Sequence, residues 1–95
     1  MDKRKAYIEK LEAQLEEWDA KIDLLKAKSK KAKAEAKIEY YNKIETLQDK
    51  YKEMQTKLYN LKTATGEAWE DIKTGVEKAV DELKDTFDKV LSKFE

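Results

Sequence analysis

Apolar residues recur at alternating steps of three and four along the first two thirds of this 95-residue chain. A spacing that averages about 3.5 residues keeps one side of a helix facing a partner helix over many turns. The members of this apolar ladder are Ile8, Leu11, Leu15, Trp18, Ile22, Leu25, Ile44, Leu47, Tyr51, Met54, Leu58 and Leu61. The ladder predicts an all-α fold in which these residues form the seam between the helices of a coiled coil.

The composition suits long helices that are exposed to solvent. Charged residues make up 44% of the chain, proline is absent and glycine occurs twice. Because the chain has no cysteine and no histidine, it offers no disulfide, no thiolate or imidazole metal ligand and no imidazole base. We therefore expect a protein that is not an enzyme and that holds no cofactor and no metal ion.

One cluster of poor helix formers interrupts the chain, at residues 63–66. Residues from about 3 to 62 contain no glycine or proline and are mostly good helix formers, so the sequence predicts one long helix there. Gly66 adopts a left-handed conformation at little cost, as the residue that closes a helix often must. We predict a turn at 63–66 with Gly66 as its hinge, followed by a second helix over 67–94.

The predicted second helix is strongly amphipathic. Its apolar face comprises Trp69, Ile72, Val76, Val80, Leu83, Phe87, Leu91 and Phe94, with Val90 beside it. Basic groups outnumber acidic groups in residues 1–33, and the reverse holds in residues 66–95. We expect the second helix to fold back on the first as an antiparallel hairpin, so that 1–95 is a single helical domain. The apolar surface that remains is expected to be buried in a homo-oligomeric helical bundle.

Between Leu25 and Ile44 the ladder contains mainly small residues, and its steps of four become more frequent. Extra steps of four relax a left-handed supercoil, which predicts a thin, basic waist in a continuous helix. The alternative is a turn near Ser29, which would make the chain a three-helix bundle. Residues 26–31 contain no glycine, proline, asparagine or aspartate, so we favour the continuous helix and leave the alternative open.

A run of lysines occupies this waist and invites comparison with nucleic-acid binding; it comprises Lys26, Lys28, Lys30, Lys31, Lys33 and Lys37. The chain has one arginine, Arg4, no net charge and no known nucleic-acid-binding motif. We therefore expect no nucleic-acid partner, and interpret the run as a solvated surface or a contact for the acidic second helix. No segment is apolar enough for a secretory signal or a membrane span, which predicts a cytoplasmic protein without integral membrane insertion.

Four segments carry a resemblance to known proteins: residues 1–11 (MDKRKAYIEKL), 31–40 (KAKAEAKIEY), 66–71 (GEAWED) and 75–79 (GVEKA). They resemble a family of short bacterial proteins that are described as coiled-coil domain-containing, or as stress-response proteins of a cyanobacterial type. The resemblance covers nearly the whole chain, and GEAWED is its most specific part. The resemblance implies a helical fold and a role in stress response, and it brings no catalytic or binding residues.

Two functions remain open from the sequence. The first is a non-catalytic, self-associating coiled-coil protein that acts as a scaffold or interaction module. The second is an apolipoprotein-like protein whose amphipathic helix binds lipid or another apolar surface. The net negative charge of residues 66–95 disfavours peripheral binding to anionic membranes. The number of chains in an oligomer, and parallel or antiparallel pairing, do not follow from the mixed residues of the seam.

Overall fold

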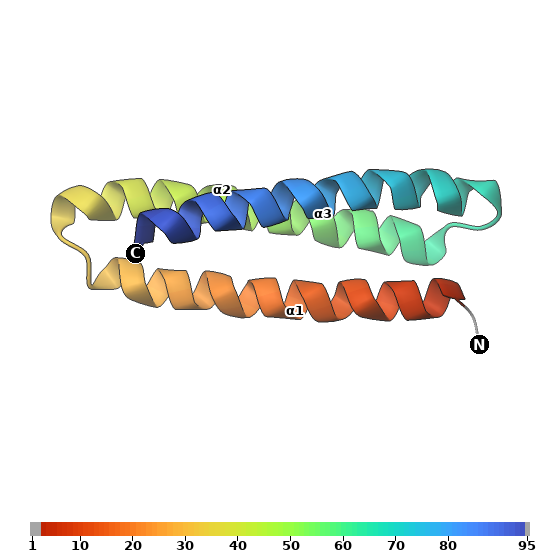
Figure 1. The fold of residues 1–95 in the computed structure, drawn as a ribbon, viewed down its shortest axis with the longest axis horizontal. Coiled ribbons are helices and arrows are strands. Elements are labelled where there is room, and N and C mark those ends of the chain that lie inside the picture. Colours follow the sequence, from red (N-terminus) through yellow and green to blue (C-terminus); the bar gives the residue numbers. More distant parts are fainter. Residues whose placement is uncertain (1–2, 95) are drawn as a thin grey trace.

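The computed structural model describes residues 3–94 and the side chains of residues 3–93. In this part of the chain the backbone forms three helices, α1 (Lys3–Lys30), α2 (Ala34–Thr63) and α3 (Glu67–Phe94). They lie side by side in an up-down-up bundle of 51 × 21 × 18 Å (Figure 1). Since a helix of about 30 residues is about 45 Å long, each helix runs nearly the full length of the bundle. The all-α fold is confirmed.

The expectation of one continuous helix over 3–62 is wrong, because the chain turns back at residues 31–33. The last turn of α1 is tightened by hydrogen bonds to carbonyls three residues back, from the N–H of Lys31 to Lys28 (3.1 Å) and from the N–H of Ala32 to Ser29 (3.2 Å). Lys33 is then extended, with φ −65° and ψ 151°. The turn thus forms without glycine or proline.

Burial of the ladder explains why the helix breaks there. A continuous helix would leave both halves of the ladder in water, whereas the turn at 31–33 packs one half against the other. Each large apolar side chain that is fully buried contributes about 1.5–3 kcal/mol. Losing a few helical hydrogen bonds at an exposed turn costs much less, so tertiary packing outweighs local helix propensity.

The second turn occupies residues 64–66, and Thr63 still belongs to α2. Gly66 has φ 59°, the left-handed conformation that other residues rarely adopt. Its carbonyl accepts a hydrogen bond from the N–H of Trp69 (3.3 Å), which starts α3. The helix expected over 67–94 corresponds to α3, and it runs antiparallel to α2 (Figure 1).

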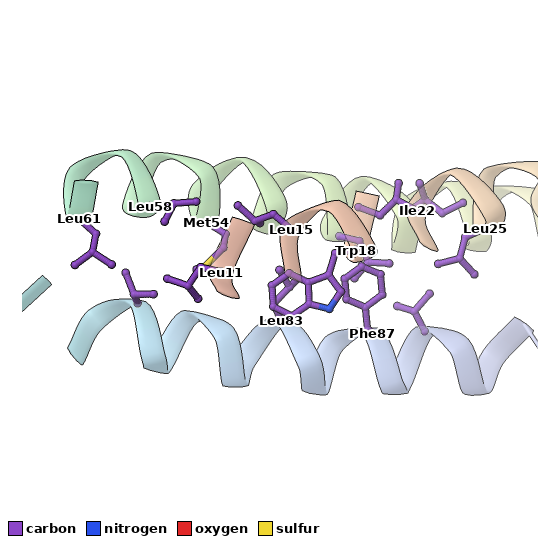
Figure 2. Close-up of a cluster of buried hydrophobic side chains, with 14 of the residues drawn as sticks. Leu11, Leu15, Trp18, Ile22, Leu25, Met54, Leu58, Leu61, Leu83 and Phe87 are labelled. Atoms are coloured by element: carbon purple, nitrogen blue, oxygen red, sulfur yellow. The ribbon is translucent and has the colours of Figure 1, made fainter. Parts of the chain in front are cut away.

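A single apolar core runs between the three helices (Figure 2). The fully buried members include Leu25, Leu47, Leu61 and Val76, none of which exposes any surface. Large aromatic side chains fill the space between α1 and α3, where the rings of Trp18 and Phe87 stack with centroids 5.8 Å apart. The core is therefore shared by all three helices.

Aromatic and cationic side chains close the core near the amino terminus of α1. Tyr7 and Trp69 meet edge to face with ring centroids 5.9 Å apart. The guanidinium of Arg4 lies 5.0 Å from the Trp69 ring centroid, and the Lys73 ammonium lies 5.0 Å from that of Tyr7. These cation–π contacts add to the apolar packing that holds α3 against α1.

Candidate interaction surface

The structure brings the residues of the predicted seam together within one chain. Ile8 and Tyr51 are partly buried, and the other ladder residues are buried in the core. In α3, Trp69, Val76, Leu83 and Phe87 are buried as well. Ile72, Val80 and Leu91 are partly buried, Val90 is buried, and the side chain of Phe94 lies outside the described residues. In the folded bundle these side chains contact one another, so a partner needs another surface.

The large apolar side chains that remain exposed are Leu24, Ile38, Tyr41 and Tyr59. Tyr41 and Tyr59 line two shallow hollows between α1 and α2, and no α3 residue lines either hollow. The two tyrosines are 18 residues apart, which is five helical turns, so they project from the same side of α2. We call the surface that contains both hollows the α1–α2 groove.

The charged side chains of α1 beside this groove form a regular stripe. Its residues follow one another at alternating steps of four and three, which keeps them on one flank of the helix. They are Glu12, Glu16, Asp19, Asp23, Lys26 and Lys30. Glu12 and Glu16 line the hollow near the second turn, and Lys26 and Lys30 line the hollow near the first turn. This α1 stripe is therefore acidic over its first part and basic over its last part.

The facing flank of α2 carries the tyrosines and mostly polar residues. This α2 stripe, again at steps of three and four, comprises Ile38, Tyr41, Glu45, Gln48, Lys52, Gln55, Tyr59 and Lys62. One ion pair joins the two stripes across the groove, from Lys62 Nζ to Glu12 Oε2 at 3.5 Å, and both side chains are 47% exposed. Because both side chains are exposed, their charges remain accessible to a partner. Exposed pairs of this kind contribute little stability, so exchanging this pair for a contact with a partner costs little.

Tyr51 lies below the middle of the groove. Burial raises the pKa of its phenol above the ordinary value of 10.0, and the negative charges of Asp19 and Glu16 raise the pKa further. The same two causes, burial first and then the charge of Glu77, raise the pKa of Tyr7 at the α1–α3 contact. The Tyr51 phenol is therefore uncharged at physiological pH, and the partly buried side chain forms part of the floor of the groove.

The lysine run surrounds the first turn at one end of the bundle, and the contacts of α3 do not support docking of its acidic residues there. Asp85 pairs with Lys89 inside α3 at 3.1 Å. Between α3 and α2, Lys93 Nζ lies 4.0 Å from Glu39 Oε1, and the Tyr40 hydroxyl donates to the Lys93 carbonyl at 3.4 Å. The apolar face of α3, rather than its charge, holds it in the bundle.

We also searched the described residues for metal-binding clusters and for membrane-spanning helices. Among the described residues, no group of acidic side chains is close enough together to hold a metal ion. None of the helices in residues 3–94 combines the length and the apolar character that crossing a membrane requires.

The sequence did not predict the α1–α2 groove, because the groove exists only once the chain turns at 31–33. The regular spacing of the α1 stripe is the sequence signal that could have pointed to it. Comparison with family models, with curated proteins and with solved structures found no match.

Proposed function

We propose that this protein is a non-catalytic, self-associating helical module that serves as a scaffold or interaction protein, and that it associates through the surface of its folded bundle. The observation that carries the proposal is the exposure of Tyr41 (50%) and Tyr59 (66%) in one groove. Tyrosine is enriched at protein interfaces because it buries a large rigid ring and offers a hydroxyl to a partner.

The packing of the ladder supports the surface of the bundle as the site of association. Separating α1 from α2 to pair the ladder with another chain would expose side chains such as Trp18 and Leu47, which are 2% and 0% exposed. Association through the groove avoids that cost. It also predicts a weaker and more reversible oligomer than a coiled coil, because charged side chains such as Glu16 and Lys30 line the groove beside its apolar residues.

Light scattering and sedimentation over the micromolar to millimolar range test this proposal. We expect a helical protein whose mass rises reversibly with concentration from that of one chain. A folded monomer at every concentration would contradict self-association. The stress-response role is part of the same proposal, and loss of survival under stress in a deletion strain of the source organism tests it.

Lipid binding by an opened bundle is the second candidate, and α3 favours it. This helix is the most strongly amphipathic of the three, and its apolar face carries Trp69 and Phe87. The turns at 31–33 and 64–66 are the places at which the bundle would open. Flotation with neutral and anionic liposomes tests this function: protein that floats with the vesicles supports it, and protein that stays behind removes it.

A further inference from the structure

We propose that the α1–α2 groove binds a second copy of this chain in antiparallel orientation, about a two-fold axis that crosses the middle of the helix pair. This arrangement rests on the self-association proposed above and adds its surface, its direction and its register. In it, α1 of one copy lies along α1 of the other, and α2 lies along α2. Each contact then occurs twice, as in any interface with two-fold symmetry.

The charge order of the α1 stripe favours the antiparallel direction. When one copy is turned end for end, its Glu12 and Glu16 approach Lys30 and Lys26 of the second copy. If α1 lay along α1 of the second copy in parallel, carboxylate would instead face carboxylate and ammonium would face ammonium. The stripe therefore complements itself in only one of the two directions.

The tyrosines of the α2 stripe also favour the antiparallel orientation of the two copies. Tyr41 and Tyr59 stand at equal distances from residue 50, on the same side of the helix. Turning one copy about residue 50 places Tyr41 of one copy over Tyr59 of the other, at both ends of the interface. Each tyrosine, half exposed or more in the single chain, then packs against a second ring.

Both stripes have their midpoints at the same level of the bundle, so one axis serves both. The midpoint of the α1 stripe lies between Asp19 and Asp23, and that of the α2 stripe is next to Tyr51. The charge of Asp19 acts on the Tyr51 phenol, which places these two residues near each other. The 3.5 Å contact of Glu12 with Lys62 places the two midpoints within about one helical turn of each other.

The central aspartates determine how strong such a dimer is. Asp19 and Asp23 of the two copies meet near the axis, where like charges repel, and Lys52 on the α2 flank supplies counter-charge. A face about 51 Å long and 21 Å wide has room for the roughly 800 Å² per partner of a standard interface. The charged side chains along the groove and the central repulsion therefore give a specific dimer of modest affinity that weakens as salt is added.

Disulfide cross-linking tests the direction and the register together, and the chain has no cysteine of its own. The full-length variants Tyr41→Cys and Tyr59→Cys are prepared separately, then mixed and oxidised. We expect the mixture to give a disulfide-linked heterodimer, because the arrangement brings these positions together. Each variant alone should cross-link much less, because its cysteines would stand about 27 Å apart, far beyond disulfide reach. Leu24→Cys, at an exposed site that lines neither hollow, is the control for random collision.

Charge reversal gives an independent measurement on the same dimer. Glu16→Lys should raise the dimer dissociation constant about tenfold, since it places repelling charges at two symmetric contacts. Adding Lys26→Glu to that variant should restore affinity. Glu17→Lys makes the same charge change on another side of α1, where Glu17 pairs with Lys21 at 3.3 Å, and it should leave the dissociation constant nearly unchanged.

The outcomes separate this arrangement from self-association itself. A protein that stays monomeric in light scattering overturns both. A dimer in which Tyr41→Cys links to itself as readily as to Tyr59→Cys overturns the antiparallel register alone. If Glu16→Lys and Glu17→Lys change the dissociation constant of the dimer equally, that result also overturns the antiparallel register alone.

Discussion

Trp18 and Phe87 join two helices that are not consecutive in the chain. Their rings stack with an interplanar angle of 17° in the middle of the core, and each side chain is 2% exposed. The sequence placed both residues on apolar faces, but it could not show that they meet. Their contact depends on the turn at 31–33, which makes α1 and α3 run parallel to each other.

We expect Trp18→Ala to reduce the free energy of unfolding by about 3–5 kcal/mol, because it leaves a cavity between α1 and α3. Chemical denaturation followed by circular dichroism measures this loss. Leu24→Ala, on the same helix at a side chain that is 54% exposed, should change stability by no more than about 0.5 kcal/mol. Equal losses in the two variants would argue against a core centred on Trp18.

Tyr51 makes stability depend on pH in the alkaline range. Its folded-state pKa lies above 10.0, mainly because of burial and then because of Asp19 and Glu16. The folded protein therefore holds the phenol proton more tightly than the unfolded chain does. This contribution is complete below pH 10 and is lost as the pH rises through the folded-state pKa.

Tyr51→Phe removes that contribution and should make the alkaline loss of stability shallower. Denaturation of the variant and of the unsubstituted protein at a series of pH values from neutral to alkaline gives the comparison. The difference in stability between the two proteins should be constant below pH 10 and should shift in favour of the variant above it. Curves that stay parallel throughout would show that the Tyr51 phenol is not perturbed.

At the scale of the helices, the two glycines of the chain have opposite roles. Gly75 lies inside α3, where an added Cβ would meet nothing within 4 Å, and its φ is not positive. No other helix approaches it closely, so the small side chain is tolerated rather than required. An added Cβ at Gly66 would also meet nothing within 4 Å, but there the φ of 59° is unfavourable for any other residue.

We therefore expect Gly75→Ala to stabilise the protein by up to about 1 kcal/mol, because alanine is the better helix former. Gly66→Ala should destabilise it by about 1–2 kcal/mol, because a Cβ strains the left-handed conformation. Thermal or chemical denaturation of the two variants measures whether each substitution raises or lowers the free energy of unfolding. If both substitutions shifted stability in the same direction, the turn at 64–66 would not have the described geometry.

For the whole molecule, the sequence predicted the helical class and the amphipathic third helix, but not the course of the chain. Amphipathic periodicity is a local property and could be recognised without the fold. The turn at 31–33 was only the less favoured alternative, expected near Ser29, because Lys33 becomes extended to satisfy packing between residues far apart in the chain. In the structure Ser29 is fully buried, and its hydroxyl donates to the Lys26 carbonyl at 2.7 Å. The candidate groove was missed for the same reason.

The ladder closes on itself within one chain, and we propose that partners bind the α1–α2 groove instead. Spin labels at Glu12→Cys and Lys62→Cys test this closure directly, with the labelled chain diluted in unlabelled protein so that only distances within one chain are read. Because Glu12 and Lys62 form an ion pair, we predict a short distance, within about 20 Å once the length of both labels is included. One continuous helix would place the two positions about 75 Å apart, and a distance of that size would show that the ladder does not close within one chain.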